Sequence, residues 1–120
     1  MRIHHLALRT ADLDRLRSFF TDVIGLRERE RHLRDDGTLR SIWLTAGDAV
    51  VMIEAAEPGE PRIPNGSMEM FAFAVNAAER VAFRSRCAAA GIAIEGETRF
   101  TTYVRDPDGR RVACSEFAFD

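Results

Sequence analysis

The chain has 120 residues, of which 46% are hydrophobic and 30% charged; this argues for one folded domain and against a disordered, collagen-like or coiled-coil protein. Its 17 basic and 19 acidic residues give a net charge of -2, which provides no positive field for binding a nucleic acid. All of the basic residues are arginine, so Schiff-base chemistry on a lysine is excluded.

The cysteines and the N-terminal residues indicate the cellular location of the protein. Cys87 and Cys114 lie in predicted helix and strand segments without any metal-binding or redox spacing, and we expect them to be buried free thiols. Residues 1–8 resemble the start of a strand and contain neither the apolar core of a signal peptide nor a membrane-spanning run. We therefore expect a cytoplasmic protein that contacts no membrane.

The first half of the chain predicts one helix and four strands. Residues 3–9 form the first strand, and Thr10 or Asp12 then caps a helix over 12–24, where apolar residues recur at spacings of three and four. Gly25 stands where a C-terminal cap belongs. Three more strands, separated by tight turns, follow over 26–33, 39–46 and 49–56.

The second half of the chain repeats the first. Residues 57–66 hold three of the four prolines and connect the halves. Aligning His5-Leu6-Ala7-Leu8 with Met70-Phe71-Ala72-Phe73 superposes the two strand-to-helix passages at an offset of 65 residues, which indicates an internal duplication. The predicted elements are a strand at 68–75, a helix at 77–90 ended by Gly91, and strands near 92–97, 100–105 and 110–119.

We therefore expect an α+β fold of two tandem βαβββ modules, which form a curved mixed sheet with a concave pocket and carry their helices on the outer face. Module one covers residues 1–56, residues 57–66 are the connection, and module two covers 67–120, all within a single domain. Alternate residues of a strand point to opposite faces, and this parity predicts which side chains line the pocket. They are His5, Trp43, Met52, Glu54, Met70, Tyr103, Ala113, Ser115 and Phe117.

Three stretches carry a family resemblance: Ile-His-His-Leu-Ala-Leu at 3–8, Phe-Phe-Thr-Asp-Val-Ile-Gly-Leu at 19–26 and Arg-Asp-Pro-Asp-Gly at 105–109. Together with the repeat, they resemble the vicinal oxygen chelate superfamily, which includes glyoxalase I, extradiol dioxygenases, fosfomycin-resistance thiol transferases and bleomycin-resistance proteins. The resemblance implies a homodimer. In metal-dependent members it also implies four strand residues, two per module and commonly His and Glu, that bind a divalent ion at the open face.

Carried over to this chain, the resemblance assigns His5 and Glu54 to one half of that ligand set. The matching positions of module two are Met70 and Ala113, the latter four residues after Asp-Pro-Asp-Gly. A thioether suits Zn, Ni, Mn or Fe ions poorly and a methyl group offers no donor, so the metal site is incomplete. We therefore expect no cofactor; the alternative is a divalent metal ion held by His5 and Glu54.

The sequence leaves three functions open. We favour binding of a small aromatic or apolar molecule, with the other seven pocket-lining residues in contact with it. The first alternative is a metal-dependent lyase, dioxygenase or thiol transferase that uses His5 and Glu54 as ligands. The second is a metal-free enzyme in which these two residues act as acid and base. A purely structural ion pair between them is a further interpretation of the same residues.

Overall fold

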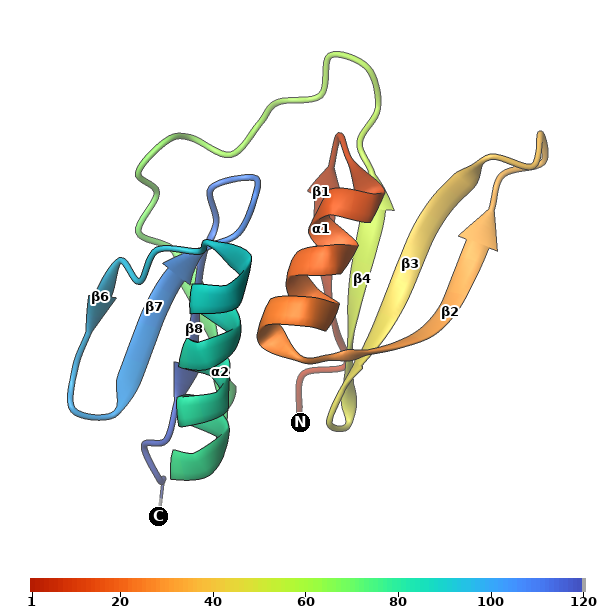
Figure 1. Cartoon of the computed structure of the whole chain (residues 1–120). Coiled ribbons are helices and arrows are strands. Elements are labelled where there is room, and N and C mark those ends of the chain that lie inside the picture. The colour runs from red at the N-terminus through yellow and green to blue at the C-terminus, as the bar shows by residue number, and fades with distance from the viewer. Residues whose placement is uncertain (120) are drawn as a thin grey trace. The chain divides into compact units, whose positions relative to one another are not determined.

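In the computed structural model of the chain, which describes residues 1–119, two compact units follow one another: Met1–Pro61, and the part that begins at Arg62. The division lies within the proline-rich stretch 57–66. Each unit is a four-stranded mixed sheet with helical structure on one face (Figure 1). The two helices are short, and within the described residues none is long and apolar enough to span a membrane.

Unit 1 places a helical segment between its first two strands. The elements are β1 (His5–Thr10), α1 (Leu13–Ser18), η1 (Phe19–Ile24), β2 (Arg27–Leu33), β3 (Leu39–Ala46) and β4 (Ala49–Ala55). The strand order is β1-β4-β3-β2, in which β1 runs parallel to β4 and the other pairs are antiparallel. The helical segment covers one face of this sheet and leaves the other face open (Figure 1).

The helix after β1 begins at the predicted cap but changes its geometry halfway. The Oδ1 atom of Asp12 accepts a hydrogen bond of 3.1 Å from the backbone N–H of Arg15. From Phe19 onward the turns are π-helical, and the segment ends at Gly25, whose φ of 96° is left-handed. The sequence predicts one continuous helix, because apolar spacing does not distinguish an α turn from the wider π turn when both bury the same side.

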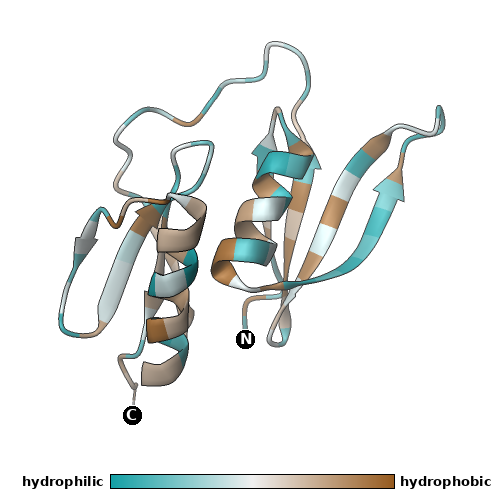
Figure 2. Ribbon diagram, in the orientation of Figure 1, coloured by the Kyte–Doolittle hydropathy of each residue, from teal (hydrophilic) through white to brown (hydrophobic). Residues whose placement is uncertain are grey.

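The core of unit 1 lies between this helical segment and the sheet. Apolar side chains from both layers are fully buried there: Leu16, Phe20, Ile42, Leu44 and Ile53. Each such side chain contributes about 1.5–3 kcal/mol through burial. The outermost strand, β2, is mostly exposed and hydrophilic (Figure 2), so its charges protect a sheet edge that would otherwise pair with another strand.

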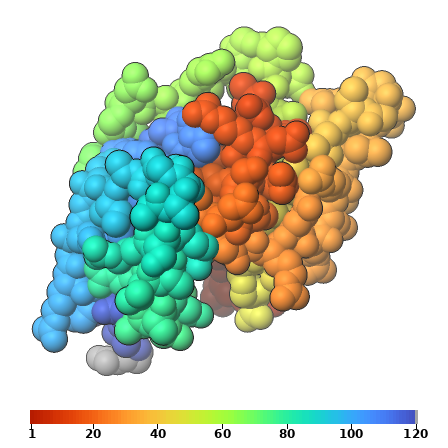
Figure 3. Space-filling view, viewed as in Figure 1, coloured from red at the N-terminus to blue at the C-terminus, as the bar shows by residue number. Residues whose placement is uncertain are grey.

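Unit 2 has the same order of elements, with shorter strands. They are β5 (Met70–Ala74), α2 (Ala77–Ala90), β6 (Gly96–Glu97), β7 (Thr101–Arg105) and β8 (Arg111–Ser115), with strand order β5-β8-β7-β6. Helix α2 has the predicted bounds; Asn76 and Glu79 cap its start reciprocally, and Gly91 ends it with a φ of 70°. The outer side of α2 forms much of the visible surface of unit 2 (Figure 3). Its inner side buries Phe83 and Cys87.

The two sheets share one register, which confirms the tandem βαβββ organisation predicted from the repeat. In unit 1, His5 on β1 pairs with Val50 on β4, and Val50 pairs with Thr45 on β3. In unit 2, Met70 on β5 pairs with Arg111 on β8, and Arg111 pairs with Arg105 on β7. Equivalent residues therefore differ in number by 65 between β1 and β5, by 61 between β4 and β8, and by 60 between β3 and β7.

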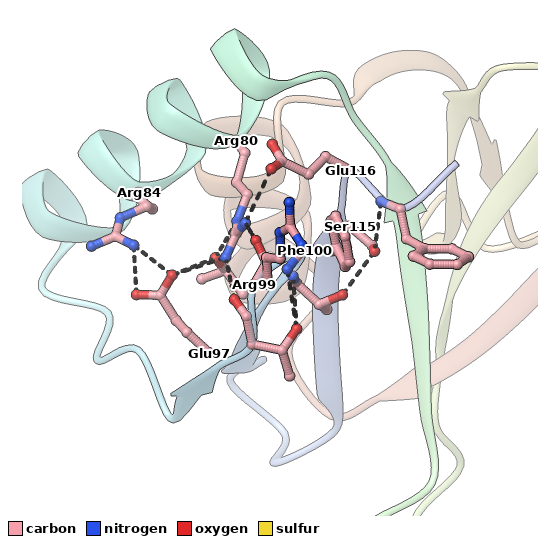
Figure 4. A network of polar contacts seen from close by, with 11 residues as sticks. Arg80, Arg84, Glu97, Arg99, Phe100, Ser115 and Glu116 are labelled. Carbon is pink, nitrogen blue, oxygen red and sulfur yellow. Dashed lines mark hydrogen bonds and ion pairs between the residues drawn. The ribbon is translucent and has the colours of Figure 1, made fainter. Parts of the chain in front are cut away.

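A polar network around Arg80 joins α2 to the turn between β6 and β7 (Figure 4). The guanidinium donates to Thr102 Oγ1 at 2.9 Å and to the backbone carbonyls of Thr98 and Arg99 at 3.0 and 2.7 Å. It also donates to Glu97 at 3.1 Å. The side chain is only 12% exposed, so these bonds hold the turn against the helix with little competition from water.

Both cysteines are free and buried, as expected from the sequence. Burial raises the pKa of the Cys114 thiol to about 12 and also raises the pKa of Cys87. Thiols held in this protonated state are unreactive, so both residues act as small apolar core side chains.

Candidate functional site

The candidate site of each unit is the sheet face that its helical segment leaves open. Alternation along the strands separates the two faces: on β1, Leu8 and Thr10 are buried on the helix side, whereas His5, Ala7 and Arg9 are exposed on the open side. The same alternation on β4 buries Val51 and Ile53 and leaves their neighbours on the open side.

Three rows of side chains cross the open face of unit 1 from β1 over β4 to β3. The register defines them as His5, Val50 and Thr45; Ala7, Met52 and Trp43; and Arg9, Glu54 and Ser41. The middle row is apolar and ends in the only tryptophan of the chain. The outer rows carry the polar and charged groups.

Three equivalent rows cross the open face of unit 2 from β5 over β8 to β7. They are Met70, Arg111 and Arg105; Ala72, Ala113 and Tyr103; and Ala74, Ser115 and Thr101. The middle row again starts with alanine, has an apolar side chain at its centre and ends in an aromatic ring. Register therefore makes Tyr103 the counterpart of Trp43. It makes Ala113 the counterpart of Met52, so the counterpart of Glu54 is Ser115 and not Ala113 as the sequence alone suggests.

His5 and Glu54 lie in different rows and do not face each other. His5 is opposite Val50, whereas Glu54 stands four residues further along β4, which is about 13 Å of strand. The ion-pair partner of Glu54 is Arg9, with 3.6 Å between Nη1 and Oε2, rather than His5, the partner in the structural interpretation that the sequence left open. The Nδ1 atom of His5 is instead 2.8 Å from the Nδ1 atom of His4.

His32 and Glu30 belong to the open face of unit 1, although neither is among the residues that strand parity predicts to line it. The pairing of β2 with β3 shifts at Arg29, so that Glu30 faces Trp43 and His32 faces Ser41. The ring centroids of His32 and Trp43 are 4.3 Å apart. The sequence of β2 alternates arginine and glutamate, and nothing in it marks the residue at which the pairing shifts. The faces of Glu30 and His32 therefore cannot be predicted from the sequence alone.

The open face of unit 2 carries an arginine stacked on an aromatic ring. The Cζ atom of Arg111 lies 4.1 Å from the centroid of Tyr103. Glu95 lies beside this pair and receives two hydrogen bonds from Arg105, of which the one from Nη2 is 3.0 Å long. These bonds lower the pKa of Glu95, so its carboxylate is charged at neutral pH.

The last two predicted site residues of unit 2 have partners within the unit. The Ser115 hydroxyl shares a hydrogen bond of 2.7 Å with the Thr101 hydroxyl. Phe117 lies beyond the end of β8 and is 50% exposed, with its ring 5.3 Å from the ring of Phe100. Strand parity assigns Phe117 to the open face, but this residue is not in the strand, because the pairing of β8 with β5 and β7 stops at Ser115.

The residues of the open faces do not fit a divalent metal ion. Across the described residues, no three His, Cys, Asp or Glu side chains gather closely enough to hold one. In unit 2 the counterpart of His5 is the thioether of Met70, and the neighbouring position holds the cationic Arg111. A guanidinium repels a cation and attracts an anion, so this face favours ligands of the opposite charge.

Comparison with known proteins identifies related sequences and folds. The family model of the Glyoxalase/Bleomycin resistance protein/Dioxygenase superfamily matches residues 2–113. A lactoylglutathione lyase from Agrobacterium tumefaciens is 25% identical, with a TM-score of 0.67 over 95% of this chain and 92% of that one. No match is found among the curated proteins.

Fosfomycin resistance proteins share the fold at lower identity. FosX from Listeria monocytogenes, solved as an E126Q mutant with Mn(II) and 1S,2S-dihydroxypropylphosphonic acid, is 16% identical, with a TM-score of 0.79 over 98% of this chain and 94% of that one. FosX from Mesorhizobium loti is 18% identical, with a TM-score of 0.78 over 98% and 93% of the two chains.

Proposed function

The chain belongs to the Glyoxalase/Bleomycin resistance protein/Dioxygenase superfamily, and from this membership we propose that it binds a small aromatic or apolar molecule on its open sheet faces. The ligand would lie against the middle rows, where apolar and aromatic side chains offer contact area and the polar groups stand to either side.

The observation that carries this proposal is the matched composition of the two middle rows. Each begins with an alanine, Ala7 or Ala72, whose small side chain leaves space above the strand, and each ends in a ring, Trp43 or Tyr103. A flat ligand stacked on such a ring gains about 0.5–1.5 kcal/mol beyond the burial of its surface.

The separation of His5 from Glu54 favours binding over the two enzymatic alternatives. Acid–base catalysis by this pair, and metal binding by the same two side chains, both require them to reach one point in space. Register places them four residues apart along adjacent strands. The lactoylglutathione lyase and the Mn(II)-containing FosX are therefore relatives in fold whose chemistry we do not extend to this chain.

Fluorescence of Trp43, the only tryptophan, tests the proposal directly. Neutral aromatic compounds such as 2-naphthamide are expected to quench it saturably in the wild type. Ala7→Arg, which fills the middle row, is expected to abolish saturation, whereas the control Glu57→Arg introduces the same side chain outside the rows and is expected to leave it unchanged. Quenching that is linear in the wild type would contradict the proposal.

Elemental analysis separates binding from metal-dependent chemistry. Protein purified without a chelator is expected to carry well under one equivalent of Zn, Ni, Mn or Fe, with no difference between the wild type and His5→Ala. One equivalent of metal that disappears in His5→Ala would overturn the proposal in favour of a metal-dependent lyase, dioxygenase or thiol transferase.

Superfamily members commonly form dimers, and we propose a homodimer for this chain as well. Sedimentation equilibrium at micromolar concentration is expected to give twice the chain mass of 13.5 kDa. A monomer mass across the same concentration range would exclude this part of the proposal.

A further inference from the structure

Three arginines of unit 2 with low exposure differ in how their donors are used. Arg80 and Arg105 are each bonded through both sides of the guanidinium fork: Arg80 to Thr102, Glu97 and two carbonyls, and Arg105 to Glu95 and to the carbonyls of Ser67 and Gly109. These two guanidinium groups therefore stabilise the unit through hydrogen bonds within it.

Arg111 pairs with Arg105 across β7 and β8, yet its Nε donor is not used in this way. Its side chain is 18% exposed, and its Nε atom is buried and lies 3.3 Å from Glu95 Oε1 without the alignment of a hydrogen bond. This Nε–H group has no hydrogen-bond partner within residues 1–119. A buried N–H group of a cation that lacks an acceptor is costly unless a ligand supplies one.

The charge balance around Arg111 is positive. Glu95 is the single carboxylate in contact with Arg111 among the described residues, and its two oxygens already accept from Arg105. Two arginines therefore share one carboxylate. The surplus charge is that of Arg111, which lies on the open face of the sheet, in the row next to Ala72 and Ala113.

The ring of Tyr103 fixes the plane of this surplus cation. A guanidinium whose Cζ lies 4.1 Å from a ring centroid is held against the ring face. The adjacent row carries only the methyl side chains of Ala72 and Ala113 on β5 and β8. An oxyanion would meet two parallel N–H groups there, while its apolar body would lie over the alanines.

We propose that Arg111 is the recognition residue for a carboxylate group, and that the ligand of the open face of unit 2 is a small aromatic carboxylic acid in its ionised form. This inference rests on the proposed binding function and adds the charge class of the ligand. Tyr103 acts as the positioning residue, because it orients the guanidinium.

Matched acid and amide probes test the inference. Calorimetric titration at pH 7.5 compares 2-naphthoate with 2-naphthamide, which share a ring system and differ in charge. The wild type is expected to bind the acid at least about ten-fold more tightly, as a charge-assisted hydrogen-bond pair predicts. Arg111→Met, which retains an apolar side chain over Tyr103, is expected to reduce the ratio of the two Kd values to about one without weakening the amide.

Arg99→Met is the matched control, because Arg99 also stacks on a ring of unit 2, with its Cζ atom 5.1 Å from the centroid of Phe100, and lies outside the rows. This variant is expected to keep the wild-type ratio of Kd values. Far-UV circular dichroism of both variants checks that the fold is intact, and Arg111→Lys, which keeps the charge but loses the fork, is expected to give an intermediate ratio.

The outcomes distinguish this inference from the proposed function. Equal Kd values for acid and amide in the wild type, or a ratio that survives in Arg111→Met, would overturn the role of Arg111 and leave small-molecule binding intact. Failure of both probes to bind would overturn the two together. Inorganic phosphate, which has charge but no ring, is expected to compete weakly; full displacement of 2-naphthoate by phosphate at equal concentration would overturn the aromatic class of the ligand.

Discussion

Replacing Arg80 by alanine is expected to cost far more stability than replacing Arg84, although both residues lie on α2 and both donate to Glu97. The Arg80 side chain is 12% exposed and bonds three further groups besides Glu97. The Arg84 side chain is 49% exposed and has Glu97 as its hydrogen-bond partner, with 2.6 Å between Nη1 and Oε1. The two variants therefore compare the same substitution at a buried arginine with several partners and at an exposed arginine with one.

The magnitude follows from the acceptors that each variant leaves behind. Arg80→Ala removes the donors to Thr102, whose residue is fully buried, and to the carbonyls of Thr98 and Arg99, which lie on exposed residues that water re-solvates. Since a hydrogen bond to a charged group contributes about 1.5–3 kcal/mol, the net loss is expected to be about 2–4 kcal/mol. An exposed pair such as Arg84 with Glu97 contributes about 0.5 kcal/mol.

Urea unfolding followed by far-UV circular dichroism measures the loss of unfolding free energy in each variant. The urea midpoint is expected to fall while the dependence of the free energy on urea concentration stays constant. In a thermal melt, Arg80→Ala is expected to lower Tm by about 8–16 °C. Hydrogen exchange localises the effect, and amides of residues 97–101 are expected to lose protection before those of β3. If Arg80→Ala and Arg84→Ala were equally stable, the network in Figure 4 would not hold the turn, and the reasoning from burial would be refuted.

Three further predictions concern the thiols, the core and one surface ion pair. Burial raises the pKa of Cys114 to about 12, so mass spectrometry is expected to show slow alkylation at pH 8 in the folded protein and rapid alkylation in denaturant. Leu16→Ala, at a fully buried site, is expected to cost about 2–5 kcal/mol in urea unfolding, and Leu33→Ala, at a residue that is 62% exposed, under about 0.5 kcal/mol; equal losses would contradict the core described above. The hydrogen bond from Arg9 lowers the pKa of Glu60, so Arg9→Met is expected to raise the midpoint of Glu60 in a carboxyl NMR titration. Because a lowered carboxyl pKa stabilises the fold at higher pH, the advantage of the wild type over Arg9→Met is expected near neutral pH and should vanish as the pH falls through the folded pKa.

Elements with a strong local signal are predictable from the sequence. Helix α2 has the predicted bounds 77–90 because apolar spacing, the Asn76 cap and Gly91 agree, and β3 has the predicted bounds 39–46 because glycine turns flank it. Strands β6 and β8 are less predictable, since β6 covers only Gly96–Glu97 of the predicted 92–97. The apolar sequence continues to Phe119, but β8 ends at Ser115, because a strand lasts only as long as its neighbours pair with it.

The register between neighbouring strands cannot be predicted from the sequence of this chain. Parity gives the face of a strand on which a side chain lies, whereas the row in which it lies depends on pairing between strands. Parity alone makes His5 and Glu54 look like neighbours, and only the pairing of β1 with β4 shows that Arg9 stands opposite Glu54. For the same reason, the stacking of the Arg111 guanidinium on Tyr103 becomes visible only when β7 and β8 are placed side by side.

The register shift at Arg29 means that β2 carries one residue at this point that has no partner on β3. Loss of this single codon would remove the extra residue without changing any other side chain, and the remainder of the strand would regain strict alternation with β3. Glu30 would still pair with Trp43 and His32 with Ser41, so the contact between the imidazole and the indole would be kept. Deletion of this one residue is therefore expected to straighten the strand without changing the tryptophan environment, whereas deletion of a paired residue of β2 would move His32 to the other face.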